Sequence, residues 1–143
     1  MNMQNLTIRS FQSEDEEAVI GLWNQCGLIV PQNNPQKDIA RKMKVNPELF
    51  LVGLYRSNLI ATCMAGYEGH RGWINYLAVV PAMRRKGIAT RLMAAAEKKL
   101  KRIGCPKINL QVRTTNKAVI NFYASIGFQD DDVLGMGKRL EQE

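Results

Sequence analysis

A basic turn in the middle of the chain is the segment best equipped for chemistry. It reads Arg84-Arg85-Lys86-Gly87 and precedes an apolar segment with helical spacing. Backbone N–H groups at the start of a helix favour an anion through the helix dipole. Gly87 has no side chain and Ala89 has only a methyl group, so a bulky phosphate can approach the backbone closely. Because three cations stand at the same place, the sequence predicts a cradle for a pyrophosphate.

The turn differs from the two best-known phosphate-binding loops. A P-loop needs Gly-x-x-x-x-Gly-Lys-Ser/Thr and a dinucleotide fold needs Gly-x-Gly-x-x-Gly, and the chain contains neither pattern. It contains instead the pattern Arg84-x-x-Gly87-x-Ala89. This pattern resembles the acetyl-CoA signature Arg/Gln-x-x-Gly-x-Gly/Ala of the GCN5-related N-acetyltransferases, the GNAT superfamily.

Two further segments strengthen this resemblance. Just before the turn, Leu77-Ala78-Val79 looks like the fourth strand of the superfamily. The segment from Asn116 to Phe128 matches the superfamily motif Asn-x-x-Ala-x-x-Phe-Tyr-x-x-x-Gly-Phe. Both motifs stand in the family's order and separation, and the resemblance covers nearly the whole chain. The segment Gly66–Gly72 is also similar to a small bacterial branch of the superfamily (YpeA-like).

The resemblance implies that acetyl-CoA is the cosubstrate and that no metal takes part. The pyrophosphate is expected on the basic turn, and the pantetheine arm is expected to bond to the backbone near Leu77 and Val79. Asn116 is expected to touch the arm, although a plain helix cap would look the same in sequence. The full set of implied cofactor contacts is Leu77, Ala78, Val79, Arg84, Arg85, Lys86, Gly87, Ile88, Ala89, Thr90, Asn116 and Tyr123.

The implied reaction is direct transfer of the acetyl group from the thioester to an amine. A typical amine has a pKa near ~10.4 and must lose a proton, and the departing thiolate benefits from a hydrogen-bond donor. A phenol is neutral at pH 7 and can donate to sulfur. Tyr123 stands where the superfamily has its acid tyrosine, so the resemblance implies that Tyr123 is the general acid. The alternative is a core tyrosine beside Phe122.

The general base is less clear from the sequence. Many relatives carry a glutamate near the start of the fourth strand, where this chain has Trp73, which cannot accept a proton. The neighbouring Asn75 and Tyr76 are poor bases as well. Glu68 is the nearest carboxylate and is interpreted as the base or as an anchor for the amine. His70, the only imidazole, and a water relay through backbone carbonyls are the open alternatives.

The residues around the expected acceptor site do not name the acceptor. The acidic run Asp130-Asp131-Asp132 could attract a cationic amine or could be an exposed turn. The loop Gly27–Asn34 is expected to form another wall, with Trp23 behind it. Amino acids, polyamines, drugs and protein N-termini therefore all stay open.

The length of 143 residues predicts one domain spanning residues 1–143. The resemblance implies an α/β fold of the GNAT acyl-CoA N-acyltransferase type, in which a twisted mixed sheet carries about four helices. Its fourth and fifth strands splay apart, partly through a bulge, and the pantetheine arm lies in the gap. The helices are expected from the N-cap Ser13 to Asn24 and over Gln36–Val45, Ile88–Ile103 and Lys117–Ile126. The strands are expected over Leu6–Arg9, Phe50–Tyr55, Leu59–Tyr67, Trp73–Val79 and Ile108–Val112, followed by a hairpin of Phe128 and Gly135–Leu140.

Composition narrows the classes of partner. The net charge is +7, and much of it lies between Arg84 and Arg102, so that a compact polyphosphate accounts for it better than a nucleic acid does. No apolar run approaches the ~20 residues of a membrane span, and no secretory signal is recognisable. Three scattered cysteines and a single histidine argue against a disulfide framework and a zinc site, and favour the cytoplasm.

Two other functions compete with the enzyme. The missing base is compatible with a CoA-binding regulatory module without catalysis, and the positive charge is compatible with a nucleic-acid-binding domain. A homodimer is an expectation that rests on the superfamily alone, since the sequence identifies no interface.

Overall fold

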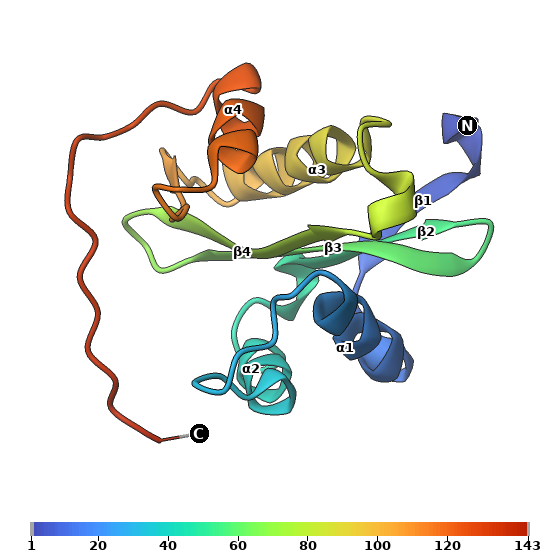
Figure 1. The fold of residues 1–143 in the computed structure, drawn as a ribbon, viewed down its shortest axis with the longest axis horizontal. Coiled ribbons are helices and arrows are strands. Elements are labelled where there is room, and N and C mark those ends of the chain that lie inside the picture. The colour runs from blue at the N-terminus through green and yellow to red at the C-terminus, as the bar shows by residue number, and fades with distance from the viewer. Residues whose placement is uncertain (1, 143) are drawn as a thin grey trace. The chain divides into compact units, whose positions relative to one another are not determined.

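The computed structural model describes residues 2–142 and divides into two compact units, residues 2–109 and residues 110–142 (Figure 1). The single domain predicted over residues 1–143 stays a prediction.

The first unit is built on a five-stranded sheet whose strands follow the order β1-β2-β3-β4-β5. The first four strands pair antiparallel, and β5 pairs parallel to β4, so the sheet is mixed as expected. The strands are β1 (Leu6–Ser10), β2 (Phe50–Tyr55), β3 (Asn58–Tyr67), β4 (Gly72–Val79) and β5 (Ile108–Asn109). Single turns of 3-10 helix span Met3–Asn5, Ser13–Asp15, Pro47–Leu49 and Pro81–Met83.

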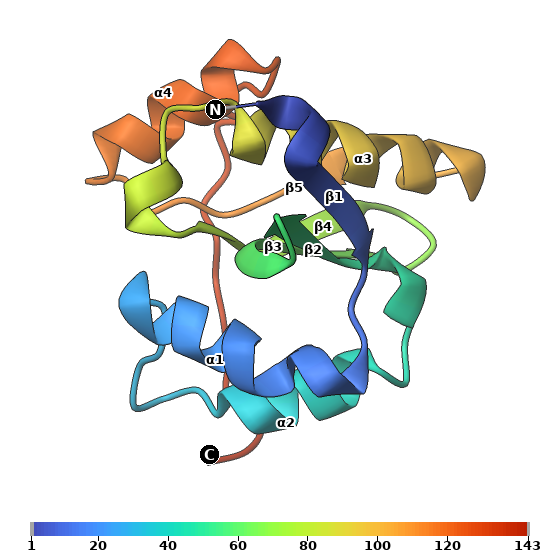
Figure 2. The ribbon, with the colours of Figure 1, turned by 90° about the vertical axis from the view of Figure 1, so that its right-hand side faces the viewer.

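Helices cover both faces of this sheet (Figure 2). The helices α1 (Glu16–Gln25) and α2 (Pro35–Lys42) lie on one face, and α3 (Ile88–Arg102) lies on the other (Figure 1). The buried side chains of α3 recur at helical spacing and are Ile88, Leu92, Met93, Ala96 and Leu100. The core under α1 and α2 is formed by Phe11, Val19, Leu22, Trp23, Ile39, Phe50, Val52, Met64 and Ala78.

The strand β4 departs from regular pairing in two places. Thr62 lies opposite Ala78 but Met64 lies opposite Asn75, so β4 carries one residue more than β3 over this stretch. Within this bulge Tyr76 adopts a left-handed backbone with φ 51°. At its start, β4 pairs with β5 only through Gly72 and Trp73. Within residues 2–142, the outer edge of β4 after Trp73 therefore has no strand partner. The predicted bulge and splay of these strands are therefore confirmed.

A buried threonine supports the bulge. The Thr62 hydroxyl accepts a hydrogen bond from Trp23 Nε1 at 2.9 Å and donates one to the backbone carbonyl of Tyr76 at 2.8 Å. Thr62 is fully buried, so water cannot replace either bond. The residue therefore links α1, β3 and β4 through one hydroxyl group.

Thr62→Val is expected to lower the free energy of unfolding by about 1–3 kcal/mol, because it leaves the Trp23 N–H and the Tyr76 carbonyl without their shared partner. Thr62→Ser keeps the hydroxyl and is the matched control. Urea denaturation of both variants measures the difference. A Thr62→Val variant no less stable than Thr62→Ser would contradict this role of the hydroxyl.

The second unit contains α4 (Lys117–Ser125). The Asn116 side chain accepts a hydrogen bond from the Val119 N–H at 3.3 Å, so the predicted N-cap of this helix is confirmed. The Tyr123 ring makes edge-to-face contacts with Phe122 and Phe128, at centroid distances of 5.1 and 5.4 Å. These contacts fix the helix to the residues that follow it.

The hairpin predicted from Phe128 and Gly135–Leu140 is wrong, since residues 128–142 form no strand. A strand needs a partner ladder, and Gly135 and Gly137 carry a high entropic cost in extended backbone. The fifth strand is also shorter than predicted and ends at Asn109 instead of Val112.

Two helix boundaries differ from the predictions by more than one residue. Gln12, not Ser13, is the first cap: its N–H donates to the Asp15 carboxylate at 2.8 Å, and a 3-10 turn precedes α1. The helix α2 ends at Lys42 rather than Val45. Asn46 has φ 50° and precedes Pro47, and a residue before proline is disfavoured in helical backbone.

Candidate active site

The predicted cradle lies between the end of β4 and the start of α3. Gly87 has φ 83° and immediately precedes α3, and Arg85 is also left-handed with φ 62°. Gly87 offers no side chain to cap the helix, so the N–H groups of the first turn of α3 keep their capacity to bind an anion. A Cβ added at Gly87 would meet no protein atom within 4 Å, which leaves open space over the helix start.

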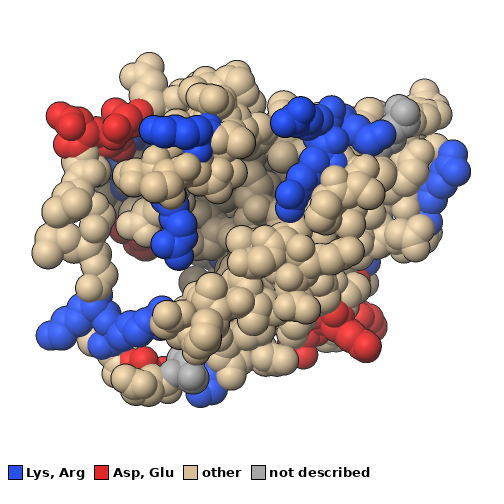
Figure 3. Space-filling view, in the orientation of Figure 1, with Lys and Arg blue, Asp and Glu red and all other residues tan. Residues whose placement is uncertain are grey.

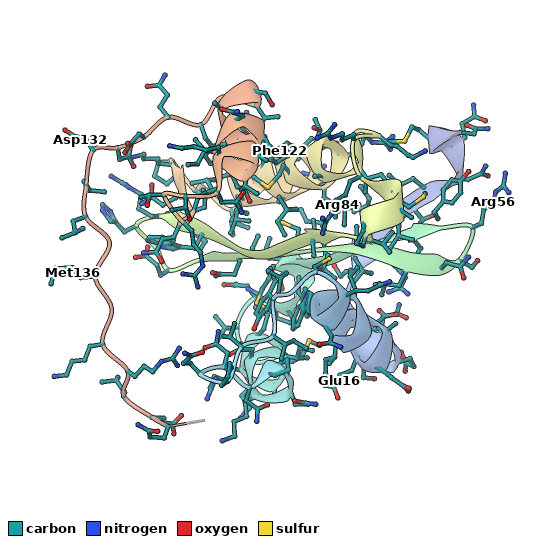
Figure 4. All side chains as sticks on the ribbon, in the orientation of Figure 1. Glu16, Arg56, Arg84, Phe122, Asp132 and Met136 are labelled. Carbon is teal, nitrogen blue, oxygen red and sulfur yellow. The ribbon has the colours of Figure 1, made fainter. Side chains whose placement is uncertain are left out.

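The three cations of the turn have different roles. Arg84 Nε donates to the backbone carbonyl of Val79 at 3.1 Å and so ties the turn to the end of β4 (Figure 4). Arg85 and Lys86 are exposed and contribute charge beside the helix start. Figure 3 shows a group of Lys and Arg side chains over this part of the first unit. The turn therefore combines a structural arginine with two cations available to a ligand.

A cluster of side chains on the face of the sheet covered by α1 and α2 joins these two helices to β4. The Tyr76 ring stacks on Trp23 of α1 with a centroid distance of 3.7 Å and an interplanar angle of 11°. Its hydroxyl donates to Asp38 Oδ2 of α2 at 2.6 Å. Arg41 donates to the other oxygen, Asp38 Oδ1, at 3.2 Å. Asp38 was missed by sequence reasoning, because only its spacing to Arg41 is visible in sequence and nothing there pairs it with Tyr76.

Glu68 lies in the turn that joins β3 to β4. Its Oε1 accepts hydrogen bonds from the backbone N–H groups of His70 and Arg71. The bond from Arg71, followed by that from His70, holds the pKa of the exposed Glu68 carboxyl below its usual value. A carboxylate that stays ionised is suited to anchoring an ammonium group and is a weaker proton acceptor. His70 is exposed in the same turn.

The second unit carries the other predicted site residues. Tyr123 and Asn116 lie on and at the start of α4. In the acidic run, the Asp132 N–H donates to Asp130 Oδ1 at 2.8 Å, and Asp132 has φ 55°. The run therefore forms a local turn of the kind that aspartate favours. The roles of these three predicted features in cofactor or acceptor binding stay predictions.

Other chemistries find no support in the described chain. Burial raises the pKa of the Cys63 thiol to about 12, so Cys63 cannot serve as a thiolate nucleophile near neutral pH. Residues 2–142 contain no group of three or more His, Cys, Asp or Glu side chains placed to hold a metal ion. Over the same residues, no helix has the length and apolar character needed to span a membrane.

Comparison with known proteins identifies the family. Residues 5–128 match the model of the acetyltransferase (GNAT) family. A Pectobacterium atrosepticum protein described as an acetyltransferase is 45% identical over 138 residues, which cover 96% of this chain and 98% of the relative. The crystal structure of Ard1 from Thermoplasma volcanium superposes with a TM-score of 0.77 at 25% identity, covering 87% of this chain and 83% of the other.

A further solved structure shares the fold. It is the PaiA N-acetyltransferase of Thermoplasma acidophilum in complex with coenzyme A, with a TM-score of 0.70 at 23% identity and coverage of 91% of this chain and 93% of the other. The similarity to this family explains the mixed sheet, the splayed fourth and fifth strands and the helix that follows the basic turn. The chain belongs to the acetyltransferase (GNAT) family.

Proposed function

We propose that this acetyltransferase moves the acetyl group of acetyl-CoA directly to a primary amine of a small molecule or a peptide. The observation that carries the proposal is that an unpaired strand edge and a helix start follow one another directly in the first unit. The outer edge of β4 beyond Trp73 has no strand partner within residues 2–142, and this edge leads into the turn that opens α3. An extended arm that ends in a pyrophosphate matches this combination.

Different residues of the first unit are proposed to bind different parts of the cofactor. Backbone groups at Leu77 and Val79 bond to the pantetheine arm, which substitutes for the missing strand. The N–H groups of Ile88, Ala89 and Thr90 bind the pyrophosphate, and Arg85 and Lys86 neutralise its charge. Ala78, Arg84 and Gly87 complete the proposed set in this unit, and a contact of Asn116 in the second unit with the arm stays a prediction. The coenzyme A complex of the related PaiA N-acetyltransferase supports this ligand.

Two side chains are proposed to act during transfer. Tyr123 donates a proton to the departing thiolate as the general acid, since a phenol is protonated at neutral pH. Glu68 anchors the ammonium form of the acceptor, in line with the lowered pKa of its carboxyl. This assignment leaves open which group removes the proton of the amine.

Release of free thiol from acetyl-CoA, scored with a panel of amines, tests the proposal. The panel holds n-butylamine, spermidine, free amino acids, an aminoglycoside and a peptide with a free N-terminus. Amine-dependent release above background hydrolysis is the expected result. Binding of acetyl-CoA without release for any amine would favour the non-catalytic module instead.

A further inference from the structure

The contact between Tyr76 and Asp38 has no role in the cofactor site described above. Tyr76 is held in left-handed backbone at φ 51°, which is costly for a bulky residue and requires support from its surroundings. That support is present: its ring stacks on Trp23, its carbonyl accepts from Thr62, and its hydroxyl donates to Asp38. Strain sustained by three separate contacts indicates a side chain whose position matters to function.

The hydrogen bond gives the phenol a defined polarity. Because Tyr76 donates its proton to the Asp38 carboxylate at 2.6 Å, the phenol oxygen acts toward any further group as an acceptor. Hydrogen bonds in series polarise one another, so the carboxylate makes this oxygen more basic than that of an isolated phenol. A lone tyrosine is a poor base, but a tyrosine backed by a carboxylate can pass a proton on.

Tyr76 also lies on the strand along which the cofactor arm is proposed to run. Tyr76 belongs to the bulge of β4, next to Leu77, where the cofactor arm is proposed to run. An arm that starts at the α3 turn and follows β4 past Val79 carries its sulfur end toward this bulge. The inference therefore rests on the proposed function, and it uses residues of the first unit only.

We infer that Tyr76 and Asp38 form the proton-accepting relay of the acetyl transfer. Before the attack, one proton of the ammonium group moves to Tyr76 Oη as the proton of Tyr76 moves to Asp38 Oδ2, which leaves the neutral amine. The amine nitrogen then bonds to the acetyl carbon, the bond between carbon and sulfur breaks, and the thiolate takes its proton from the general acid. The second proton, which the nitrogen loses as it becomes an amide, restores that acid. Asp38 has a side-chain exposure of 27%, so it can return the accepted proton to water. Tyr76 is the catalytic residue of the pair, and Asp38 is its positioning residue.

The rigidity of the pair fits this task. Trp23 is fully buried and fixes the plane of the Tyr76 ring, and Arg41 bonds to the Asp38 oxygen that Tyr76 leaves unused. A relay needs its groups held in one geometry by neighbouring packing and hydrogen bonds. The cluster meets this condition before any ligand binds.

Acceptors of different basicity test the relay. Tyr76→Phe keeps the stacking ring and is expected to lower kcat/KM for n-butylamine by at least about 100-fold, the usual contribution of a positioned base. The loss for hydroxylamine, which is largely neutral at neutral pH, is expected to be much smaller. Asp38→Asn should show the same pattern, and the double variant should be little worse than either single variant, because the two groups act as a unit.

Tyr55→Phe, at the end of β2, is the matched control and should retain the activity of the unchanged chain. Equal activity of Tyr76→Phe and the unchanged chain would overturn the relay. So would an equal loss for both acceptors, because a structural role does not distinguish amines by basicity. Failure of the unchanged chain to bind acetyl-CoA in calorimetry would instead overturn the proposed function itself.

Discussion

Tyr123→Phe is expected to lower kcat by about 100- to 10,000-fold, the range over which a positioned acid accelerates proton transfer. The substitution keeps the ring contacts with Phe122 and Phe128, so α4 and the affinity for acetyl-CoA should stay nearly unchanged. Steady-state thiol release measures kcat, and calorimetry measures Kd. The drop should appear in kcat and not in Kd, because the proposed proton transfer takes place after binding.

Tyr55→Phe serves again as the control for loss of a phenol hydroxyl. Unchanged turnover in Tyr123→Phe would remove the acid role from Tyr123 and would favour the interpretation of this residue as a structural tyrosine. A parallel loss of folding and activity would lead to the same conclusion.

Gly87→Ala is expected to weaken acetyl-CoA binding by at least about tenfold, or about 1.4 kcal/mol. Its backbone has φ 83°, which costs a residue with a Cβ about 1–2 kcal/mol. No protein atom lies within 4 Å of the added Cβ, so the methyl group would enter the space proposed for the phosphate. Calorimetric titration with acetyl-CoA measures the change.

The other end of α3 supplies a close control. Gly104 has φ 86° and equally open surroundings, so Gly104→Ala imposes the same backbone strain away from the proposed cradle. Both variants should lose similar stability in urea denaturation, and only Gly87→Ala should lose affinity. Equal affinities in the two variants would show that the start of α3 does not contact the cofactor.

Local patterns in the sequence were enough to predict most of the helices and strands. The strand Phe50–Tyr55 was predicted with its observed bounds, and the helix after the basic turn ends one residue before the prediction. Both segments combine a clear periodicity with glycine or turn residues at their ends. The family resemblance then supplied the mixed sheet, the splay of the fourth and fifth strands and the bulge, which periodicity alone does not encode.

Features that depend on distant residues were not predictable in the same way. The hydrogen bond from Tyr76 to Asp38 joins residues 38 positions apart. The types of these two residues do not predict that they are in contact. A left-handed tyrosine has no sequence signal comparable to that of a glycine. The hairpin after Phe128 failed for the opposite reason, since its apolar residues suggested strands for which residues 110–142 provide no partner.

The three cations of the turn, Arg84, Arg85 and Lys86, have different roles in the proposed account. Arg84 is used to fasten the turn to β4, so that Arg85, Lys86 and the helix start carry the proposed anion site. A nucleic acid would be bound mainly through many phosphate contacts and would dissociate steeply with salt. One compact polyphosphate on one turn does not need such a surface.

Calorimetric titration of the unchanged chain with acetyl-CoA, with ADP as the phosphate-only control, tests the central claim most directly. The account predicts binding of acetyl-CoA with a Kd on the order of micromolar, much tighter than that of ADP, because both the turn and the unpaired edge of β4 contribute. Equal affinity for the two ligands would contradict the role of the β4 edge. Absence of binding to either ligand would show that the turn before α3 is only the start of a helix.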